Sequence, residues 1–317
     1  MTPLDYARRY WKLQVPMGTG PDATVQTVKI HQYRLVNMTG GASPSLTAKD
    51  RLLGEAKKAL LKDKTVEVQV VLSRDPGQRQ SFIFTQWSDL AVILLRPFIG
   101  KGSPEEVQVA LQLAVRYGLT SEANLQQYAD DSRIGLDCNG FVGNYLRQRN
   151  DGSLKWYGMS SDTTSSSSRI RDLLQKEGRQ VKKVDELTPE GIYMMGLVDG
   201  SGEVVNTSVP AGHVTITEPF TLGSSYLPGV AAAAAAVPPV VGPARAGIGV
   251  ASYLLNHVAR AVPGSAPTLQ VVESTGAKNN GLVSSTYGLQ PPTAKGVFTV
   301  QRGLGMGQMK VKIFRLT

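Results

Sequence analysis

A single cysteine, Cys138, is the feature that most constrains how this chain can fold. With one cysteine in 317 residues, no disulfide can form within the chain, and a metal site built from paired cysteines is excluded. A noncovalent core must therefore hold the fold together, and a chain of this length can bury one of ample size. A lone cysteine is often only a small buried hydrophobic residue, so its sequence context decides whether it has a chemical role.

The composition indicates a globular chain with many turns and strands. Apolar residues make up 41% and charged residues 19%, and the chain has 33 glycines and 18 prolines. The most apolar stretch, residues 227–255, is interrupted by prolines and includes Arg245, so we expect no membrane span. Residues 1–15 are charged and have no apolar core of a secretory signal. This pattern leaves cytoplasmic action or export by a non-classical route as the expectation.

The formal net charge of +9 favours contact with an anionic partner, and a solvated basic surface is the alternative interpretation. The densest basic stretch, residues 169–183, is interleaved with Asp172 and Glu177 and does not resemble a nucleic-acid-binding arm. We therefore expect no specific nucleic-acid partner. The partners that remain are an anionic polymer or a peptide.

Residues 1–100 are predicted to form an accessory α+β region. Runs rich in β-branched residues are separated by turn signals such as Asp75-Pro76-Gly77. Nothing in this region groups titratable residues in a suggestive way. The expected elements are a strand over 24–36, a helix over 47–62, and strands over 66–72 and 81–85.

Residues 101–317 are predicted to form a second domain with a Pro/Ala-rich insertion at about 219–266. Its first helix has Ser103 as N-cap, Pro104 at the first helical position and Glu106 at the third. Another helix is expected in 169–177. Strands are expected over 192–198, 214–217, 269–273, 297–300 and 310–316.

Cys138 lies where a further helix is predicted to begin. Phe141, Val142, Tyr145 and Leu146 follow it with the spacing of one helical face. The unpaired N–H groups at a helix start favour negative charge, and the thiolate is the nucleophilic form of cysteine. A catalytic cysteine in this position needs a histidine within reach across the fold.

Only three histidines can serve Cys138: His31, His213 and His257. His31 lies in the N-terminal region, and His257 lies at the edge of the insertion. His213 follows Gly212 and opens the strand expected over 214–217, where its side chain can face a cleft. The residues favour His213 modestly.

Three short motifs resemble one family. Asp137-Cys138-Asn139-Gly140-Phe141 is similar to the Asp-Cys-Ser-Gly-Phe signature of NlpC-type papain-like cysteine hydrolases, which are cell-wall peptidases and amidases related to CHAP domains. Gly212-His213-Val214-Thr215-Ile216 is similar to their Gly-His-Val-Gly-Ile motif, and Val271-Val272-Glu273-Ser274-Thr275 to a following strand. The motifs also occur in the order that the family has.

The resemblance implies a papain-like α+β fold, in which the nucleophile helix packs on an antiparallel sheet. It implies cleavage of amide bonds, typically in peptidoglycan peptides, without a cofactor or metal. Cys138 would attack the carbonyl, His213 would move the proton, and Glu273 would orient the imidazole. The backbone N–H of Cys138 would help to hold the oxyanion.

The chain departs from the family pattern in several places. Asn139 replaces the usual serine, and the family's tyrosine upstream of the cysteine has only Tyr128 as a candidate, at a different spacing. Glu218 and Asn280 compete with Glu273 for the third role, as does Asn279. Two other functions stay open: an acyltransferase, deamidase or toxin-like effector with the same site, and a non-catalytic binding or structural protein on a degenerate scaffold.

Overall fold

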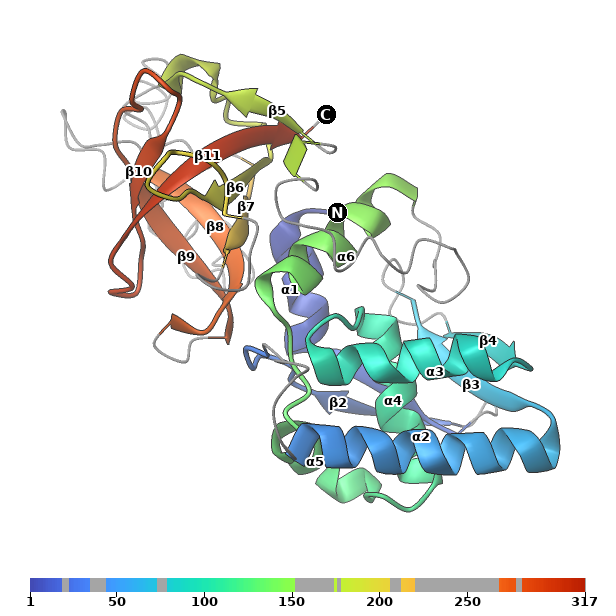
Figure 1. Ribbon diagram of the computed structural model, residues 1–317. Helices are drawn as coiled ribbons and strands as arrows, with labels where there is room; N and C mark the ends of the chain where they lie inside the picture. The colour runs from blue at the N-terminus through green and yellow to red at the C-terminus, as the bar shows by residue number, and fades with distance from the viewer. Residues whose placement is uncertain are drawn as a thin grey trace, which may run out of the picture. The chain divides into compact units, whose positions relative to one another are not determined.

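The structure is a computed structural model (Figure 1) and describes residues 1–18, 23–34, 44–72, 79–151, 174–175, 178–205, 212–219, 268–277 and 281–316. The chain forms two compact units, each assembled from separate stretches of sequence. Unit 1 comprises Met1–Leu173, His213–Ile216 and Val272–Ser284, and unit 2 comprises Leu174–Gly212, Thr217–Val271 and Ser285–Thr317. The division into residues 1–100 and 101–317 stays a prediction.

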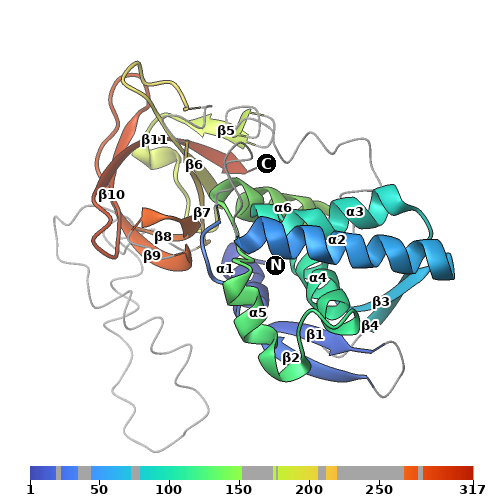
Figure 2. The ribbon, with the colours of Figure 1, turned by 60° about the horizontal axis from the view of Figure 1, so that its bottom comes forward.

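Unit 1 is mainly helical, and α4 packs against α2, α3 and the hairpin strands β1 and β3 (Figure 2). Two antiparallel hairpins join β1 to β2 and β3 to β4. The helices are α1 (Pro3–Trp11), α2 (Pro44–Asp63), α3 (Trp87–Leu95), α4 (Pro104–Arg116), α5 (Leu125–Asp131) and α6 (Cys138–Asp151), with short 3-10 turns η1 (Arg96–Ile99) and η2 (Glu122–Asn124). The hairpin strands are β1 (Leu13–Met17), β2 (Thr24–Val28), β3 (Val66–Val71) and β4 (Arg79–Phe84).

Helix α4 begins where the sequence predicts it. The Ser103 hydroxyl accepts a hydrogen bond from the Glu106 N–H at 3.3 Å, and the Glu106 carboxylate accepts one from the Ser103 N–H at 2.8 Å. This capping box satisfies two N–H groups that a helix start otherwise leaves unpaired. Glu106 is buried and also binds the Arg96 guanidinium at 2.9 Å, which compensates its charge.

Two buried glutamines of α4 form hydrogen bonds with backbone groups of the strands that the helix covers. The Gln108 carbonyl accepts from the Val71 N–H at 2.7 Å, and the Gln112 amide donates to the Pro16 carbonyl at 2.6 Å. A buried backbone group without a partner costs free energy comparable to a lost hydrogen bond. These glutamines therefore let a helix that is buried from Pro104 to Ala114 lie against strand backbone.

A second set of strands forms a closed antiparallel barrel (Figure 1). The strand order is β10-β9-β8-β7-β6-β11, with β5 beyond β11, and the pairing of β10 with β11 closes the ring. Along β11, residues 308–311 pair with β10 and residues 313–316 pair with β5, while residues 311–315 pair with β6. The strands are β5 (Gly178–Val181), β6 (Tyr193–Leu197), β7 (Val214–Thr217), β8 (Thr268–Thr275), β9 (Gly281–Leu289), β10 (Phe298–Gln301) and β11 (Gln308–Leu316), with a 3-10 turn η5 (Val184–Glu186) between β5 and β6.

The core of unit 2 comes from alternate positions on these strands. Phe298 and Val300 on β10 are fully buried with Val311 and Ile313 on β11, and Tyr287 joins them from β9. Alternation of this kind places one face of each strand inside a barrel. Apolar burial is the main favourable term that stabilises such a fold.

The predicted papain-like fold, with a nucleophile helix packed on an antiparallel sheet, is wrong. The sheet closes into a six-stranded barrel accompanied by helices, and this is a different architecture. The reason is that β11 is long enough to pair with two strands along one of its edges. The sequence indicates where strands lie, but pairing between distant strands is set by tertiary packing.

Most of the expected elements are present near their predicted positions. The helix expected over 47–62 is α2, and the strand expected over 214–217 has the bounds of β7. Of the stretch 169–177, only 174–175 are described, and the insertion at 219–266 lies outside the described residues except for residue 219. Within the part of the chain that is described, no helix is long and apolar enough to cross a membrane.

Candidate active site

Cys138 is the first residue of α6, as the sequence predicts. The Asp137 carboxylate caps the helix by accepting a hydrogen bond from the Gly140 N–H at 2.5 Å, and its carbonyl accepts from the Phe141 N–H at 3.0 Å. Cys138 is buried, with 5% of its surface exposed. The thiol therefore lies at the end of the helix where the macrodipole favours negative charge.

The apolar face of α6 anchors this helix in unit 1. Phe141 and Tyr145 are fully buried and lie against the Tyr6 ring of α1, with ring centroids 5.8 Å and 5.9 Å away. Tyr10 packs edge-on against Tyr6 at 5.5 Å. Aromatic packing of this kind restrains the helix that carries Cys138.

Glycine is required where the loop before α4 crosses the start of α6. A Cβ atom at Gly140 would lie 2.0 Å from the Gly100 carbonyl oxygen. The same Gly100 carbonyl accepts a hydrogen bond from the Asp137 N–H at 3.0 Å. This close approach holds the residue before Cys138 against the backbone of the loop.

The structure brings His213 and Glu273 together. His213 precedes β7, Glu273 lies on β8, and the His213 Nε2 atom is 2.8 Å from the Glu273 Oε2 atom. The Glu273 side chain is fully buried, and that of His213 is 13% exposed. A buried carboxylate on Nε2 sets the orientation and tautomer of the ring and leaves Nδ1 for another partner.

Cys138 is the other partner of His213. Burial lowers the pKa of the His213 imidazole, but hydrogen bonds with Cys138 and Glu273 and the negative charge of both groups raise it, and the pKa reaches about 9. The imidazole therefore interacts with both a thiol and a carboxylate, and all three residues belong to unit 1. This arrangement can hold an imidazolium beside Cys138 at neutral pH.

The competing residues have other positions or lie outside the described part of the chain. The Glu218 side chain is buried in unit 2, and its N–H donates to the Gln270 carbonyl at 2.9 Å. The His31 carbonyl accepts from the Leu282 N–H at 2.7 Å, and its ring atom Nδ1 is buried without a hydrogen-bond partner among the described atoms. His257 and Asn280 lie outside the described residues, as does Asn279.

Tyr33 is a neighbour of Cys138 that the sequence did not indicate. Burial raises the pKa of the Tyr33 hydroxyl, and the charges of Cys138 and Asp137 raise it further. The segment is held on both sides of Tyr33, because the Gln32 carbonyl accepts from the Leu136 N–H and the Arg34 N–H donates to the Leu136 carbonyl, each at 2.9 Å. The N-terminal region, expected to be accessory, therefore supplies a residue beside the thiol.

Tyr33 has no local signal in the sequence, because it reaches Cys138 only through the tertiary fold. Tyr128, the tyrosine suggested by the motif, lies on α5. Burial raises the pKa of Tyr128, which the Ser132 side chain opposes.

Comparison with protein-family models, with curated proteins and with solved structures finds no match for this chain. Among the described residues, no group of three or more His, Cys, Asp or Glu side chains is arranged to hold a metal ion. The function is therefore argued from the geometry of the site and from its sequence motifs.

Proposed function

We propose that this protein is a thiol-dependent hydrolase of amide bonds, with Cys138 as nucleophile, His213 as general base and acid, and Glu273 as the residue that orients the imidazole. The observation that supports it most is the interaction of the His213 ring with both the Cys138 thiol and the buried Glu273 carboxylate. A nucleophile, a base and a group that orients the base form the common pattern of covalent catalysis in hydrolases.

In the first half of the reaction, the Cys138 sulfur attacks the amide carbonyl carbon, and its proton is held on His213. The oxyanion of the tetrahedral intermediate lies toward the N–H groups at the start of α6, which stabilise developing negative charge. Collapse of the intermediate breaks the C–N bond, and His213 gives its proton to the leaving amine. The product of this half is an acyl thioester on Cys138.

In the second half, His213 takes a proton from water while the water oxygen attacks the thioester carbonyl. The second tetrahedral intermediate breaks the C–S bond and releases a carboxylic acid. The Cys138 thiolate and the His213 imidazolium are restored. Glu273 stabilises the imidazolium in both halves without being protonated.

We infer that the substrate is a peptide, most simply in peptidoglycan. The motifs around Cys138 and His213 resemble those of NlpC-type cell-wall peptidases and amidases. The net charge of +9 also suits an anionic polymer, because opposite charge raises the local concentration of a substrate.

The test is hydrolysis of peptidoglycan peptides by the full chain and by Cys138→Ala and His213→Ala. We expect each substitution to reduce turnover by about 10⁴-fold or more, while circular dichroism shows retained folding. His31→Gln is the matched control, since it changes a histidine outside the proposed triad, and it should keep most of the turnover. Full activity in Cys138→Ala would overturn the proposal.

A further inference from the structure

The helix cap beside Cys138 creates an electrostatic conflict. The Asp137 carboxylate is buried and immediately precedes the nucleophile in the chain. A negative charge near a thiol disfavours its thiolate, which is the form that reacts. A neutral cap would avoid this conflict, so the carboxylate needs a compensating charge.

Lys101 supplies that charge. Its ammonium lies 2.9 Å from Asp137 Oδ1 and 2.7 Å from Oδ2, so it contacts both oxygens of the carboxylate. The Lys101 side chain is 16% exposed and that of Asp137 is 7% exposed. Solvent screens a pair with so little exposure only weakly.

The backbone of Lys101 is held in place independently of its ammonium. The Lys101 carbonyl accepts hydrogen bonds from the Arg96 guanidinium at 2.5 Å and from the Asn144 side-chain amide of α6 at 3.0 Å. A substitution at the Lys101 side chain therefore removes a charge and leaves the loop anchored to α6.

The other charged and titratable groups around Cys138 and Asp137 come from several segments of the chain. His213, just before β7, binds Glu273 of β8, and Arg96 of η1 is paired with Glu106 while it also attracts Asp137. Tyr33 is neutral below the range of its raised pKa, for which burial is the main cause. Lys101 is thus the positive group that contacts the capping carboxylate directly among the described residues.

We propose that Lys101 is a positioning residue of the thiol site, which neutralises the Asp137 cap and so permits the thiolate of Cys138. This inference rests on the proposed function, because it assumes that Cys138 reacts as a thiolate. Asp137 then keeps two roles that would otherwise oppose each other. It caps the helix as an acceptor, and it adds little net negative charge beside the nucleophile.

The test is the pH dependence of alkylation of the full chain by iodoacetamide. Cys138 is the one cysteine, so the labelled site is unambiguous. We expect Lys101→Met to move the midpoint of the curve of alkylation rate against pH to higher pH by about one unit. Below the midpoint, alkylation should then be about tenfold slower. Lys101→Arg should restore the wild-type profile, because it keeps the positive charge.

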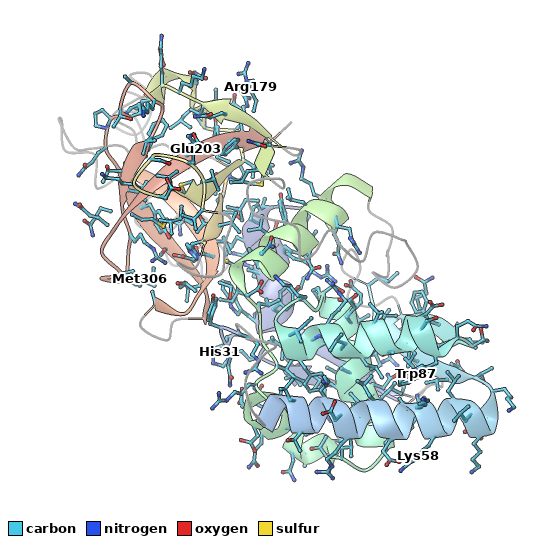
Figure 3. The ribbon with its side chains drawn as sticks, viewed as in Figure 1. His31, Lys58, Trp87, Arg179, Glu203 and Met306 are labelled. Carbon is cyan, nitrogen blue, oxygen red and sulfur yellow. The ribbon has the colours of Figure 1, made fainter. Side chains whose placement is uncertain are left out.

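The double variant Lys101→Met with Asp137→Asn tests the mechanism directly. Asparagine caps a helix without a charge, so the double variant should recover the wild-type midpoint, and it remains measurable if Lys101→Met alone folds poorly. Lys58→Met is the matched control. Lys58 extends from α2 with its side chain 73% exposed (Figure 3), so its loss should leave the profile unchanged.

The outcomes separate the two proposals. A low wild-type midpoint that does not move in Lys101→Met, or that the double variant does not restore, overturns the role of Lys101 alone. A free cysteine has a pKa of about 8.5. If the wild-type midpoint lies near that value and Lys101→Met does not move it, both this role and the proposed thiolate chemistry are overturned.

Discussion

At the scale of single residues, His213 determines what the site can do. Burial disfavours its charged form, yet the Cys138 thiol and the Glu273 carboxylate outweigh burial and raise its pKa to about 9. An imidazolium therefore persists through neutral pH, and it is lost as the pH rises through about 9. Proton donation to a leaving amine should fail above that pH.

Glu273→Gln tests this balance. The substitution removes a negative charge from the imidazole, so the pKa of His213 should fall and the alkaline limb of kcat/KM should move from near pH 9 to lower pH. Turnover at the optimum should drop by about 10² to 10⁴-fold, the range for general acid–base catalysis. The measurement is a pH–rate profile on a peptide substrate, and an unmoved alkaline limb would contradict the role given to Glu273.

The residues of the site differ in how far sequence could predict them. Cys138 and His213 stand in short motifs, and Glu273 was one of several candidates until the structure placed its carboxylate on the imidazole. Lys101 and Tyr33 carry no motif. Each reaches the thiol region through packing of segments that are distant in the chain, which no local pattern encodes.

At the scale of elements, the starts of α4 and α6 could be predicted closely. The cap of α4 could be predicted from Ser103, Pro104 and Glu106, because a capping box depends on residues three positions apart. The start of α6 at Cys138 follows from the same local chemistry. By contrast α1 was not expected, although Thr2 caps it by accepting a hydrogen bond from the Asp5 N–H and Pro3 stands at its first position.

Ser103→Ala should lower the free energy of unfolding by about 1 to 2 kcal/mol, since it removes the side-chain acceptor for the Glu106 N–H. Ser121→Ala is the matched control. Ser121 also precedes a helical turn, but it is exposed and makes no side-chain cap bond, so its change should be below about 0.5 kcal/mol. Urea denaturation of both variants measures the difference, and equal effects would count against the buried capping box.

Gly140→Ala should be harmful although alanine is the better helix former. Its Cβ would lie 2.0 Å from backbone, the Gly100 carbonyl oxygen, so the start of α6 must shift. We expect a loss of about 1 to 3 kcal/mol and slower alkylation of Cys138. Gly54→Ala in α2 is the control with opposite sign, because its Cβ meets nothing within 4 Å and should stabilise the protein by about 0.5 to 1 kcal/mol. Thermal unfolding measures both, and a stabilised Gly140→Ala would refute the close approach.

At the scale of the whole molecule, the fold could not be predicted from the strand signals. The runs at 192–198, 214–217 and 310–316 were expected as strands, and all three contain strands of the barrel. Their pairing was not indicated, because β11 joins β5 and β6 across long stretches of chain. A motif resemblance around the site gave the catalytic candidates but the wrong architecture.

Phe298→Ala tests the core of unit 2. Phe298 is fully buried on β10 where this strand pairs with β11, so the cavity should cost about 3 to 5 kcal/mol. Thr299→Ala is the control on the same strand, at a half-buried position on its other face, and should cost less than about 1 kcal/mol. Guanidinium denaturation followed by tyrosine fluorescence distinguishes them, and equal costs would argue against a barrel interior at Phe298.

Closure of the barrel also bears on self-association. Unpaired strand edges are templates for strand addition by other molecules, and a complete ring removes them. The ring leaves β5 as its appended strand, attached through residues 313–316 of β11. Arg179 projects exposed from β5 (Figure 3), and a charge at this place discourages another chain from docking there. Resistance of the barrel to strand addition would thus depend on one short, cationic strand.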